Sequence, residues 1–395
     1  MLEIVQIVSE FSTDGGVETV SRELARAWSF AKISNKVLTC SKGGKKSADA
    51  CVEQVASWLS WLPTRGSFRY IGRLIVVPIF TLLATLKARR YSKTAVIVSH
   101  GDSLGGDVLV VHAIDSASIA EKKAGGRWRW RFNPMHGWVG WRDHWMIGGL
   151  RYNMYVAVSA RVAKELQKYY SVPADRIRVI SNGVDLKRFK RDESRRQPVR
   201  ANFGIPLTAR LLLFVGHEFD RKGLAFAIGA LKKLSPDVWL LVVGSDNPAP
   251  YRRLAAQVRD RVVFAGPQAD MPAFYSASDA FVLPTAYETF SLVCMEAMAC
   301  GVPVFATRVG GIEDYLIDGV NGYAIARDET KIAEVLDAAL RDEKRLDAMR
   351  EGARLTAQDF GWDAIAAQYT LLLNEVWEKK ASALGLARYP AQRLN

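Results

Sequence analysis

Residues 280–304 read AFVLPTAYETFSLVCMEAMACGVPV, and this stretch decides the fold that we expect. The apolar run at 280–283 has the length of a buried strand, and 292–299 has the length and apolar content of a buried helix. Gly301 then ends the helix, and a second apolar run follows at 304–306. A strand, a helix and a second strand in this order are typical of a parallel sheet covered by helices.

The same alternation of strands and helices occurs twice along the chain. Strands are predicted at 2–8, 36–38, 95–98, 108–111 and 154–158, and again at 211–215, 239–243, 262–264, 280–283 and 304–306. We therefore predict an α/β protein with two Rossmann-like parallel-sheet domains, residues 1–180 and 207–360. The polar stretch 181–206 is predicted to be a linker. Apolar residues recur at helical spacing after residue 361, which predicts a final helix over about 361–380.

The composition excludes several classes of protein. With 395 residues, 49% of them hydrophobic and 24% charged, each half can bury a core, so disorder is not expected. Four cysteines without paired spacing predict neither a disulfide framework nor a zinc site, and they favour a reducing compartment. The longest apolar run, 74–86, is too short to span a membrane, and the first residues read as a strand rather than a signal peptide.

The net charge of +13 is concentrated in the first half of the chain. Residues 1–180 contain 26 Lys and Arg against 14 Asp and Glu, whereas residues 181–395 contain 28 against 27. The two halves are therefore expected to meet different partners, and an anionic partner is expected for the first.

Two glycines after the first strand are candidates for ligand contact. Ligands of such sheets lie beyond the carboxyl ends of the strands, so we expect a site in the loops that follow strands. Gly15 and Gly16 lead into a helix whose free N–H groups can hold an anion. A flexible turn explains the two glycines equally well.

A basic pair follows the strand at 211–215. Gly216 is followed by Arg221 and Lys222, which stand beside Gly223 at the start of a helix. The positive charges and the free helical N–H groups favour the same anion, so the segment predicts a pyrophosphate clamp. The alternative is a pair of solvated basic residues.

Two glutamates belong to the stretch quoted above. Glu288 lies in the loop after a strand, and Glu296 lies inside an otherwise apolar helix, where a charge needs a partner. Carboxylates accept hydrogen bonds from vicinal hydroxyls, so the pair suits a sugar or a ribose. A purely structural Glu296 is the alternative.

Taken in order, these motifs resemble the retaining GT-B glycosyltransferases of family 4, over nearly the whole chain. They read Gly15-Gly16-Val-Glu, Val-Ala-Val-Ser159, Ile-Ser-Asn182-Gly183-Val-Asp185, Arg221-Lys222-Gly223, Glu288 to Glu296 with Ala-Met-Ala-Cys-Gly, and Gly310-Gly311. Within that family, Phe219 to Gly223 and Val-Val-Gly244-Ser-Asp-Asn-Pro248 are most similar to lipopolysaccharide core glucosyltransferases. The resemblance implies two domains facing a cleft, with the C-terminal helix crossing back to the first domain.

The resemblance also implies a donor site for a nucleotide sugar. Arg221 and Lys222 would hold the diphosphate and Glu296 the ribose, while Glu288 would bind the donor sugar. The full implied donor site is Gly15, Gly16, Gly216, Arg221, Lys222, Glu288, Phe290, Ser291, Leu292 and Glu296. At position 291 many members of the family carry Gly where this chain has Ser.

The implied reaction retains the configuration of the anomeric carbon as a nucleoside diphosphate leaves, with UDP as the expected nucleotide. Stabilising the leaving diphosphate is then the main catalytic task. The expected catalytic residues are His112, Arg221, Lys222 and Glu288, and His112 matches the family's strand-end histidine near the reacting sugar. No cofactor is expected, and because no Asp-x-Asp occurs, no catalytic metal is expected. The other histidines of the first half, His100, His136 and His144, are expected to be structural.

By the same resemblance the first domain binds the acceptor, which is expected to be a lipid-linked or lipopolysaccharide-core saccharide. Its charge also favours an anionic membrane surface, and interfacial tryptophans would anchor it there. The expected acceptor or membrane residues are Trp58, Trp61, Arg65, Arg69, Arg73, Arg127, Trp128, Arg129, Trp130 and Arg131. Trp138, Trp141 and Trp145 are spaced for one helix face and are expected in the core.

These observations predict a cytoplasmic glycosyltransferase at the inner face of the plasma membrane. A GT-B enzyme of another reaction, such as a sugar-nucleotide epimerase, is the nearest alternative, and it would act without an acceptor. A nucleic-acid-binding protein would also suit alternating basic and aromatic residues. That alternative leaves the segment from Glu288 to Glu296 unexplained, so no nucleic-acid partner is expected.

Overall fold

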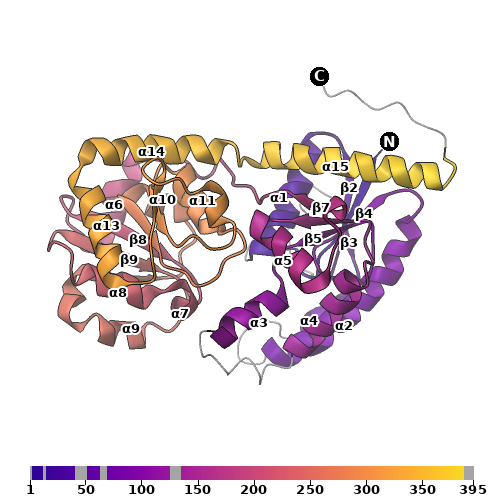
Figure 1. Ribbon diagram of the computed structural model, residues 1–395, viewed down its shortest axis with the longest axis horizontal. Coiled ribbons are helices and arrows are strands. Elements are labelled where there is room, and N and C mark those ends of the chain that lie inside the picture. The colour runs from indigo at the N-terminus through magenta and orange to yellow at the C-terminus, as the bar shows by residue number, and fades with distance from the viewer. Residues whose placement is uncertain (1, 12–14, 41–50, 63–68, 125–134, 387–395) are drawn as a thin grey trace. The chain divides into compact units, whose positions relative to one another are not determined.

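The computed structural model describes residues 2–11, 15–40, 51–62, 69–124 and 135–386 of the chain (Figure 1). The chain divides into two compact units, one of Met1–Asn182 with Trp362–Asn395 and the other of Gly183–Gly361. Each unit contains one parallel sheet with helices packed against it, so the prediction of an α/β fold with two Rossmann-like sheets is confirmed.

The first unit has a seven-stranded sheet in the order β3-β2-β1-β4-β5-β6-β7, in which every neighbouring pair is parallel. Apolar residues on both faces bury the central strands, which is why these strands read as short apolar runs. The strands are β1 (Glu3–Ile7), β2 (Ser34–Thr39), β3 (Cys51–Gln54), β4 (Val96–Ser99), β5 (Val108–Val111), β6 (Met154–Ala157) and β7 (Ile177–Val179).

The helices of the first unit follow from apolar spacing on one face. In the first of them Val20, Leu24 and Trp28 recur every four residues, and all three are buried. The helices are α1 (Gly16–Phe30), α2 (Arg69–Ala88), α3 (Asp115–Ala124), α4 (Met135–Asp143), α5 (Ala160–Tyr170) and α15 (Trp362–Ala383). Short 3-10 helices are η1 (Ser57–Trp61), η2 (Arg89–Tyr91) and η5 (Ala174–Arg176), and η4 (His144–Gly148) is a π-helix.

The last helix, α15, belongs to the first unit, as predicted (Figure 1). It packs against α1, where the indole nitrogen of Trp28 donates a hydrogen bond of 3.1 Å to the hydroxyl of Thr370. The ring of Tyr369 meets the same indole edge-on, with the ring centroids 6.3 Å apart. The chain thus returns to its first sheet through a buried aromatic contact.

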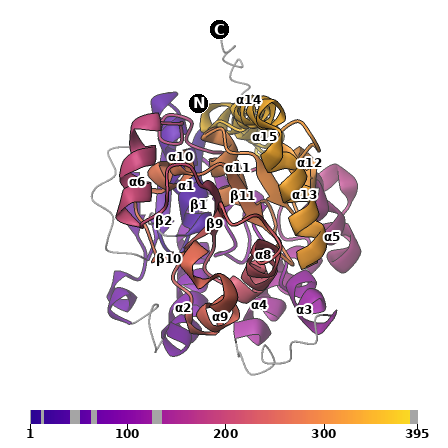
Figure 2. The same cartoon turned by 90° about the vertical axis from the view of Figure 1, so that its left-hand side faces the viewer.

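The second unit has a six-stranded sheet in the order β10-β9-β8-β11-β12-β13, again parallel throughout. Its strands are β8 (Arg210–Val215), β9 (Val238–Val243), β10 (Val262–Gly266), β11 (Ala280–Leu283), β12 (Val304–Ala306) and β13 (Gly322–Ala324). Helices α8 and α13 lie side by side against this sheet (Figures 1 and 2). The helices and turns are η6 (Glu193–Arg195), α6 (Arg196–Asn202), α7 (Phe219–Lys222), α8 (Leu224–Leu231), α9 (Ala249–Leu254), η7 (Ala256–Arg261), α10 (Met271–Ala277), α11 (Leu292–Ala299), α12 (Ile312–Tyr315), α13 (Glu329–Arg341) and α14 (Glu343–Gln358).

The polar stretch that we predicted to be a linker, 181–206, is folded almost entirely onto the second unit. Within it, Arg200 on α6 is fully buried, and its guanidinium donates a hydrogen bond of 2.8 Å to Asp279, the residue before β11. Arg196 donates to the other carboxylate oxygen of Asp279 at the same distance. Arg196 and Arg200 are therefore ion-pair partners of the second unit, whereas Lys187, Arg188 and Lys190 of the same stretch are exposed.

Among the described residues, every helix is too short or too polar to cross a bilayer. The 20-residue helix α2, which contains Pro78, is included in that statement.

Candidate active site

The predicted clamp lies beyond the carboxyl end of β8. Gly216 follows the strand, and Arg221 and Lys222 form the last part of the short helix α7. Gly223 ends that helix at φ +81°, where a Cβ atom would lie 2.1 Å from the carbonyl oxygen of Pro284. Only glycine fits here, and this close approach brings the basic pair against the loop that follows β11.

Glu288 is the residue that the clamp surrounds. Its Oε1 accepts hydrogen bonds from Lys222 Nζ at 2.5 Å, from Thr285 Oγ1 at 3.1 Å and from Arg221 Nη1 at 3.3 Å. Arg221 also donates to the carbonyl oxygen of Tyr287 at 2.5 Å. The carboxylate is buried, and charge-assisted hydrogen bonds of this kind offset the cost of burying it. Arg221, Lys222 and Glu288, predicted from separate segments, are thus in direct contact.

The loop from Glu288 to Leu292 ends at the N-terminus of α11. Gly310, at φ +60°, packs so closely that a Cβ would lie 1.8 Å from the carbonyl oxygen of Glu288. The buried ring of Phe290 packs on Tyr315, whose hydroxyl donates 2.9 Å to the carbonyl oxygen of Phe290. The packing of Gly310 and Tyr315 therefore fixes the conformation of the loop. Leu292 begins a helix whose first N–H groups can bind an anion.

Ser291 adopts the backbone conformation that glycine usually takes. Its φ is +70° and its ψ is 79°, in the left-handed region that a side chain makes costly. Its side chain does not cap α11, and its hydroxyl lies 3.2 Å from the thiol of Cys294. The family's glycine at this position thus has a conformational reason, and this chain carries Ser in the same kind of turn.

Glu296 lies one turn into α11 with a single described hydrogen-bond partner. The hydroxyl of Tyr275 donates to its Oε2 at 2.9 Å. Burial raises the pKa of Glu296 to about 7, against the opposing effects of that hydrogen bond and of the positive charge of Arg188. A carboxylate of this kind is near balance between its charged and neutral forms, so a hydroxyl group that donates to it would favour the charge.

The first unit carries the remaining predicted residues, Gly15, Gly16 and His112. Gly15 is the extended N-cap of α1 and has no side chain to cap it, and the carboxylate of Glu18 fills the space beside it. His112 directly follows β5, and its Nε2 lies 3.0 Å from Nδ1 of His100. Burial lowers the pKa of His112 to about 4, so its ring is neutral at physiological pH. His100, which we expected to be only structural, is therefore its direct neighbour.

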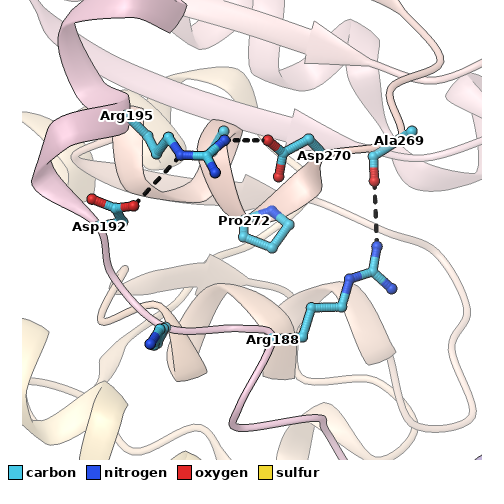
Figure 3. A pocket seen from close by; sticks show the side chains of 8 residues that line it. Arg188, Asp192, Arg195, Ala269, Asp270 and Pro272 are labelled. Atoms are coloured by element: carbon cyan, nitrogen blue, oxygen red, sulfur yellow. Dashed lines mark hydrogen bonds and ion pairs between the residues drawn. The ribbon is translucent and has the colours of Figure 1, made fainter.

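Sequence reasoning missed a basic pocket in the second unit (Figure 3). Figure 3 shows Arg195 between Asp192 and Asp270. Its Nη1 donates a hydrogen bond of 2.6 Å to Oδ2 of Asp270. Arg188 donates to the carbonyl oxygen of Ala269 at 3.3 Å, and its charge acts on Glu296. The sequence signal that could have indicated this pocket was the high density of basic residues in 181–206, which we assigned to a linker. The full lining is Arg188, Lys190, Asp192, Arg195, Ala269, Asp270, Pro272 and Ala273.

The residues predicted for a membrane surface are only partly described. Arg65 and the run Arg127, Trp128, Arg129, Trp130 and Arg131 lie outside the described residues, and Arg69 begins α2. Trp58 and Trp61 are 59% and 75% exposed, and Arg73 is exposed. On α2, the side chains of Ile75, Leu82 and Leu86 are also exposed, at spacings of one helix face.

The prediction that Trp141 and Trp145 belong to the core is wrong. These side chains are 51% and 44% exposed. The indoles instead contact one another. The rings of Trp138 and Trp141 are tilted by 33° with centroids 5.1 Å apart, and those of Trp141 and Trp145 are stacked with centroids 6.1 Å apart. Arg151 covers the ring of Trp145, with its guanidinium carbon 4.5 Å from the centroid. Contact between neighbouring rings explains why these tryptophans recur at helical spacing although their side chains are not buried in the core.

The arrangement of the sheets defines the class of protein. WaaG, a glycosyltransferase involved in lipopolysaccharide biosynthesis, matches with a TM-score of 0.75 at 22% identity, over 94% of this chain and 99% of that chain. HepE of Anabaena, solved in complex with UDP and glucose, matches with a TM-score of 0.71 at 20% identity, over 95% and 100%. The fold is therefore the GT-B fold.

Sequence comparison identifies the family within that class. The family model described as Glycosyltransferase Family 4 matches residues 14–188, and the model described as Glycosyl transferases group 1 matches residues 195–356. The chain belongs to the family 4 glycosyltransferases.

Curated relatives match over a shorter range. The D-inositol 3-phosphate glycosyltransferase of Xylanimonas cellulosilytica is 37% identical over 226 residues, which is 54% of each chain. That of Thermobispora bispora is 32% identical over 242 residues, which is 57% of this chain and 56% of the relative. The match thus spans about half the length of these relatives.

Proposed function

We propose that the protein is a retaining hexosyltransferase that transfers a hexose from a UDP-sugar to a saccharide acceptor. The observation that carries this proposal is the convergence of Lys222, Arg221 and Thr285 on one oxygen of Glu288, beside the N-terminus of α11. Two cations and a set of free N–H groups are thereby fixed before a diphosphate arrives. Membership of family 4 and the UDP complex of HepE support the choice of donor.

In this proposal the second unit stabilises the leaving group. Arg221 and Lys222 contact the diphosphate, and negative charge that develops on it as the glycosidic bond breaks is offset by charge already in place. Glu288 orients both cations through Oε1 and binds donor-sugar hydroxyls. Gly216, Phe290, Ser291 and Leu292 complete the phosphate-binding backbone of the second unit. Gly15 and Gly16 are proposed as further donor-binding residues. His112 contacts a hydroxyl of the hexose.

Glu296 is proposed to bind the ribose hydroxyls through its ionised form. Because burial raises its pKa to about 7, the apo protein must release a proton at lower pH before the carboxylate can accept those hydroxyls. The affinity for UDP should therefore fall as the pH decreases below about 7, by up to about tenfold per pH unit.

The acceptor is proposed to be an anionic, lipid-linked saccharide such as a lipopolysaccharide core, because the first half of the chain is strongly basic. The exposed Trp58, Trp61 and the α2 side chains Ile75, Leu82 and Leu86 would meet the surface of an anionic bilayer on the cytoplasmic side. Inositol phosphate is the second candidate acceptor, favoured by the curated relatives, and its phosphate suits the same positive charge. A vesicle co-sedimentation assay with and without anionic lipid tests the membrane contact.

The experiment that tests the proposal measures binding and slow hydrolysis of UDP-, GDP- and ADP-sugars. Arg221→Ala and Glu296→Ala are expected to lose selective binding of one nucleotide. Arg253→Ala and Glu334→Ala, which change exposed residues on α9 and α13, are the matched controls and should bind normally. Equal binding by all four variants would contradict the assigned donor site, and an epimerised but intact nucleotide sugar would favour the epimerase alternative.

A further inference from the structure

Three neighbouring strands of the first sheet carry a line of hydrogen-bonded side chains. Gln6 lies on β1, His100 follows β4 and His112 follows β5, and these strands are adjacent in the order β1-β4-β5. Nε2 of His100 lies 2.9 Å from Oε1 of Gln6, and Nδ1 of His100 lies 3.0 Å from Nε2 of His112. The line connects a fully buried amide to a partly exposed histidine at the carboxyl end of the sheet.

Gln6 determines where the protons lie along this line. Its Nε2 donates to the backbone carbonyl oxygen of Ser21 at 3.3 Å, which requires that Oε1 face His100. An amide oxygen only accepts, so Nε2 of His100 carries the proton and Nδ1 of His100 is an acceptor. Nε2 of His112 must then donate to it. In the neutral ring of His112, Nδ1 is left as the acceptor.

The surroundings keep both rings neutral. Burial lowers the pKa of His112 to about 4 and the pKa of His100 well below its usual range, and the proximity of His112 lowers the latter further. A proton added to Nδ1 of His100 would also point at the N–H of His112 across 3.0 Å. Among the described residues, none hydrogen-bonds to Nδ1 of His112.

We propose that Gln6 and His100 are positioning residues that hold His112 in the tautomer whose Nδ1 accepts a hydrogen bond from a hydroxyl of the donor hexose. This inference rests on the proposed function and adds to it the residues that set the state of His112. A neutral acceptor suits the step, because the anomeric carbon becomes positively charged as a glycosidic bond breaks. The other tautomer would present an N–H to the same hydroxyl and reverse the hydrogen bond.

The test compares two buried substitutions at either end of one contact. Gln6→Met keeps the length of the side chain and removes the amide oxygen that orients His100. Ser21→Ala is the matched control, because it removes only the hydroxyl that donates 3.1 Å to Gln6 Oε1 and keeps the backbone carbonyl that orients the amide. Three quantities are measured in each protein: the imidazole tautomers by ¹⁵N NMR, the affinity for UDP by calorimetry, and the turnover of the UDP-sugar. The signal of His112 is assigned from its loss in His112→Gln.

Wild type and Ser21→Ala are expected to show His112 protonated on Nε2. Gln6→Met is expected to show a mixture of tautomers. Its turnover should fall about tenfold, which corresponds to the free energy of one hydrogen bond lost in the transition state, while its affinity for UDP stays within about twofold. A wild-type His112 protonated on Nδ1 would overturn the assignment, as would full turnover in a Gln6→Met protein whose tautomers have changed. If the wild type binds no nucleotide sugar, the proposed function fails together with the sugar contact, and the NMR spectra still decide the tautomer.

Discussion

Glu296 predicts an unusual pH dependence of stability. Burial raises its pKa from 4.5 to about 7 in the folded protein, so the folded state holds this proton more tightly than the unfolded chain does. The stabilisation is fully present below pH 4.5 and is lost as the pH rises through about 7. Glu296→Gln removes the titrating group and keeps an oxygen that can accept the hydrogen bond of Tyr275.

The magnitude follows from the size of the pKa change. At about 1.4 kcal/mol for each tenfold change in proton affinity, the full effect is about 3 kcal/mol. Between about pH 5 and about pH 8.5, the free energy of unfolding of the wild type should fall by about 2.5 kcal/mol more than that of Glu296→Gln. Any cost of the amide that does not depend on pH cancels in this difference.

Urea unfolding followed by far-ultraviolet circular dichroism at the two pH values measures this difference. Glu334→Gln, an exposed substitution on α13, is the control and should follow the wild type at both. The reasoning is refuted if the wild type and Glu296→Gln lose the same free energy between the two pH values, because the carboxyl group would then titrate normally in the folded state.

Three further changes have expected outcomes, the first two measured by urea unfolding and the third by urea unfolding together with an activity assay. Ser291→Gly should stabilise the protein by up to about 1 kcal/mol because φ is +70° there, and Ser291→Ala, which keeps the strained conformation, should not; equal effects would argue against strain. Asp279→Ala should cost about 3–5 kcal/mol because it leaves the buried guanidinium of Arg200 without its charge partner, and a loss below about 1 kcal/mol would contradict that pairing. Truncation before residue 361 removes α15 and uncovers Trp28, so the chain should be destabilised or inactive, and full activity of the truncated protein would show that the contact is dispensable.

The central strands of both sheets could be predicted, but three of the four edge strands could not. Strands buried on both faces need apolar residues at every position, which makes runs such as 108–111 and 280–283 visible in the sequence. β3 is the edge strand of the first sheet and is mostly exposed, and β7 at the other edge has only three residues. β13 is equally short. These exposed or three-residue strands have too few buried apolar positions to be recognised, whereas β10, the remaining edge strand, has five residues and was predicted at 262–264.

The candidate donor site was visible in part because its motifs are local. Arg221 and Lys222 stand beside a glycine after a strand, and Glu288 stands after another, so each could be found from its own segment. Their contact joins residues 66 and 67 positions apart and depends on β8 lying next to β11 in the sheet. The pairing of His100 with His112 likewise required the adjacency of β4 and β5.

Short-range patterns were enough for the alternation of strands and helices, the two parallel sheets and the segments that carry the candidate site. Each of these depends on residues that are neighbours along the chain, whose spacing reflects the geometry of a single strand or helix. Strand order, ion pairs such as that of Arg200 with Asp279, and the proton arrangement from Gln6 to His112 join residues far apart in sequence. Those contacts form when separate elements pack together, and the residue spacing within one element does not indicate which other element it will contact.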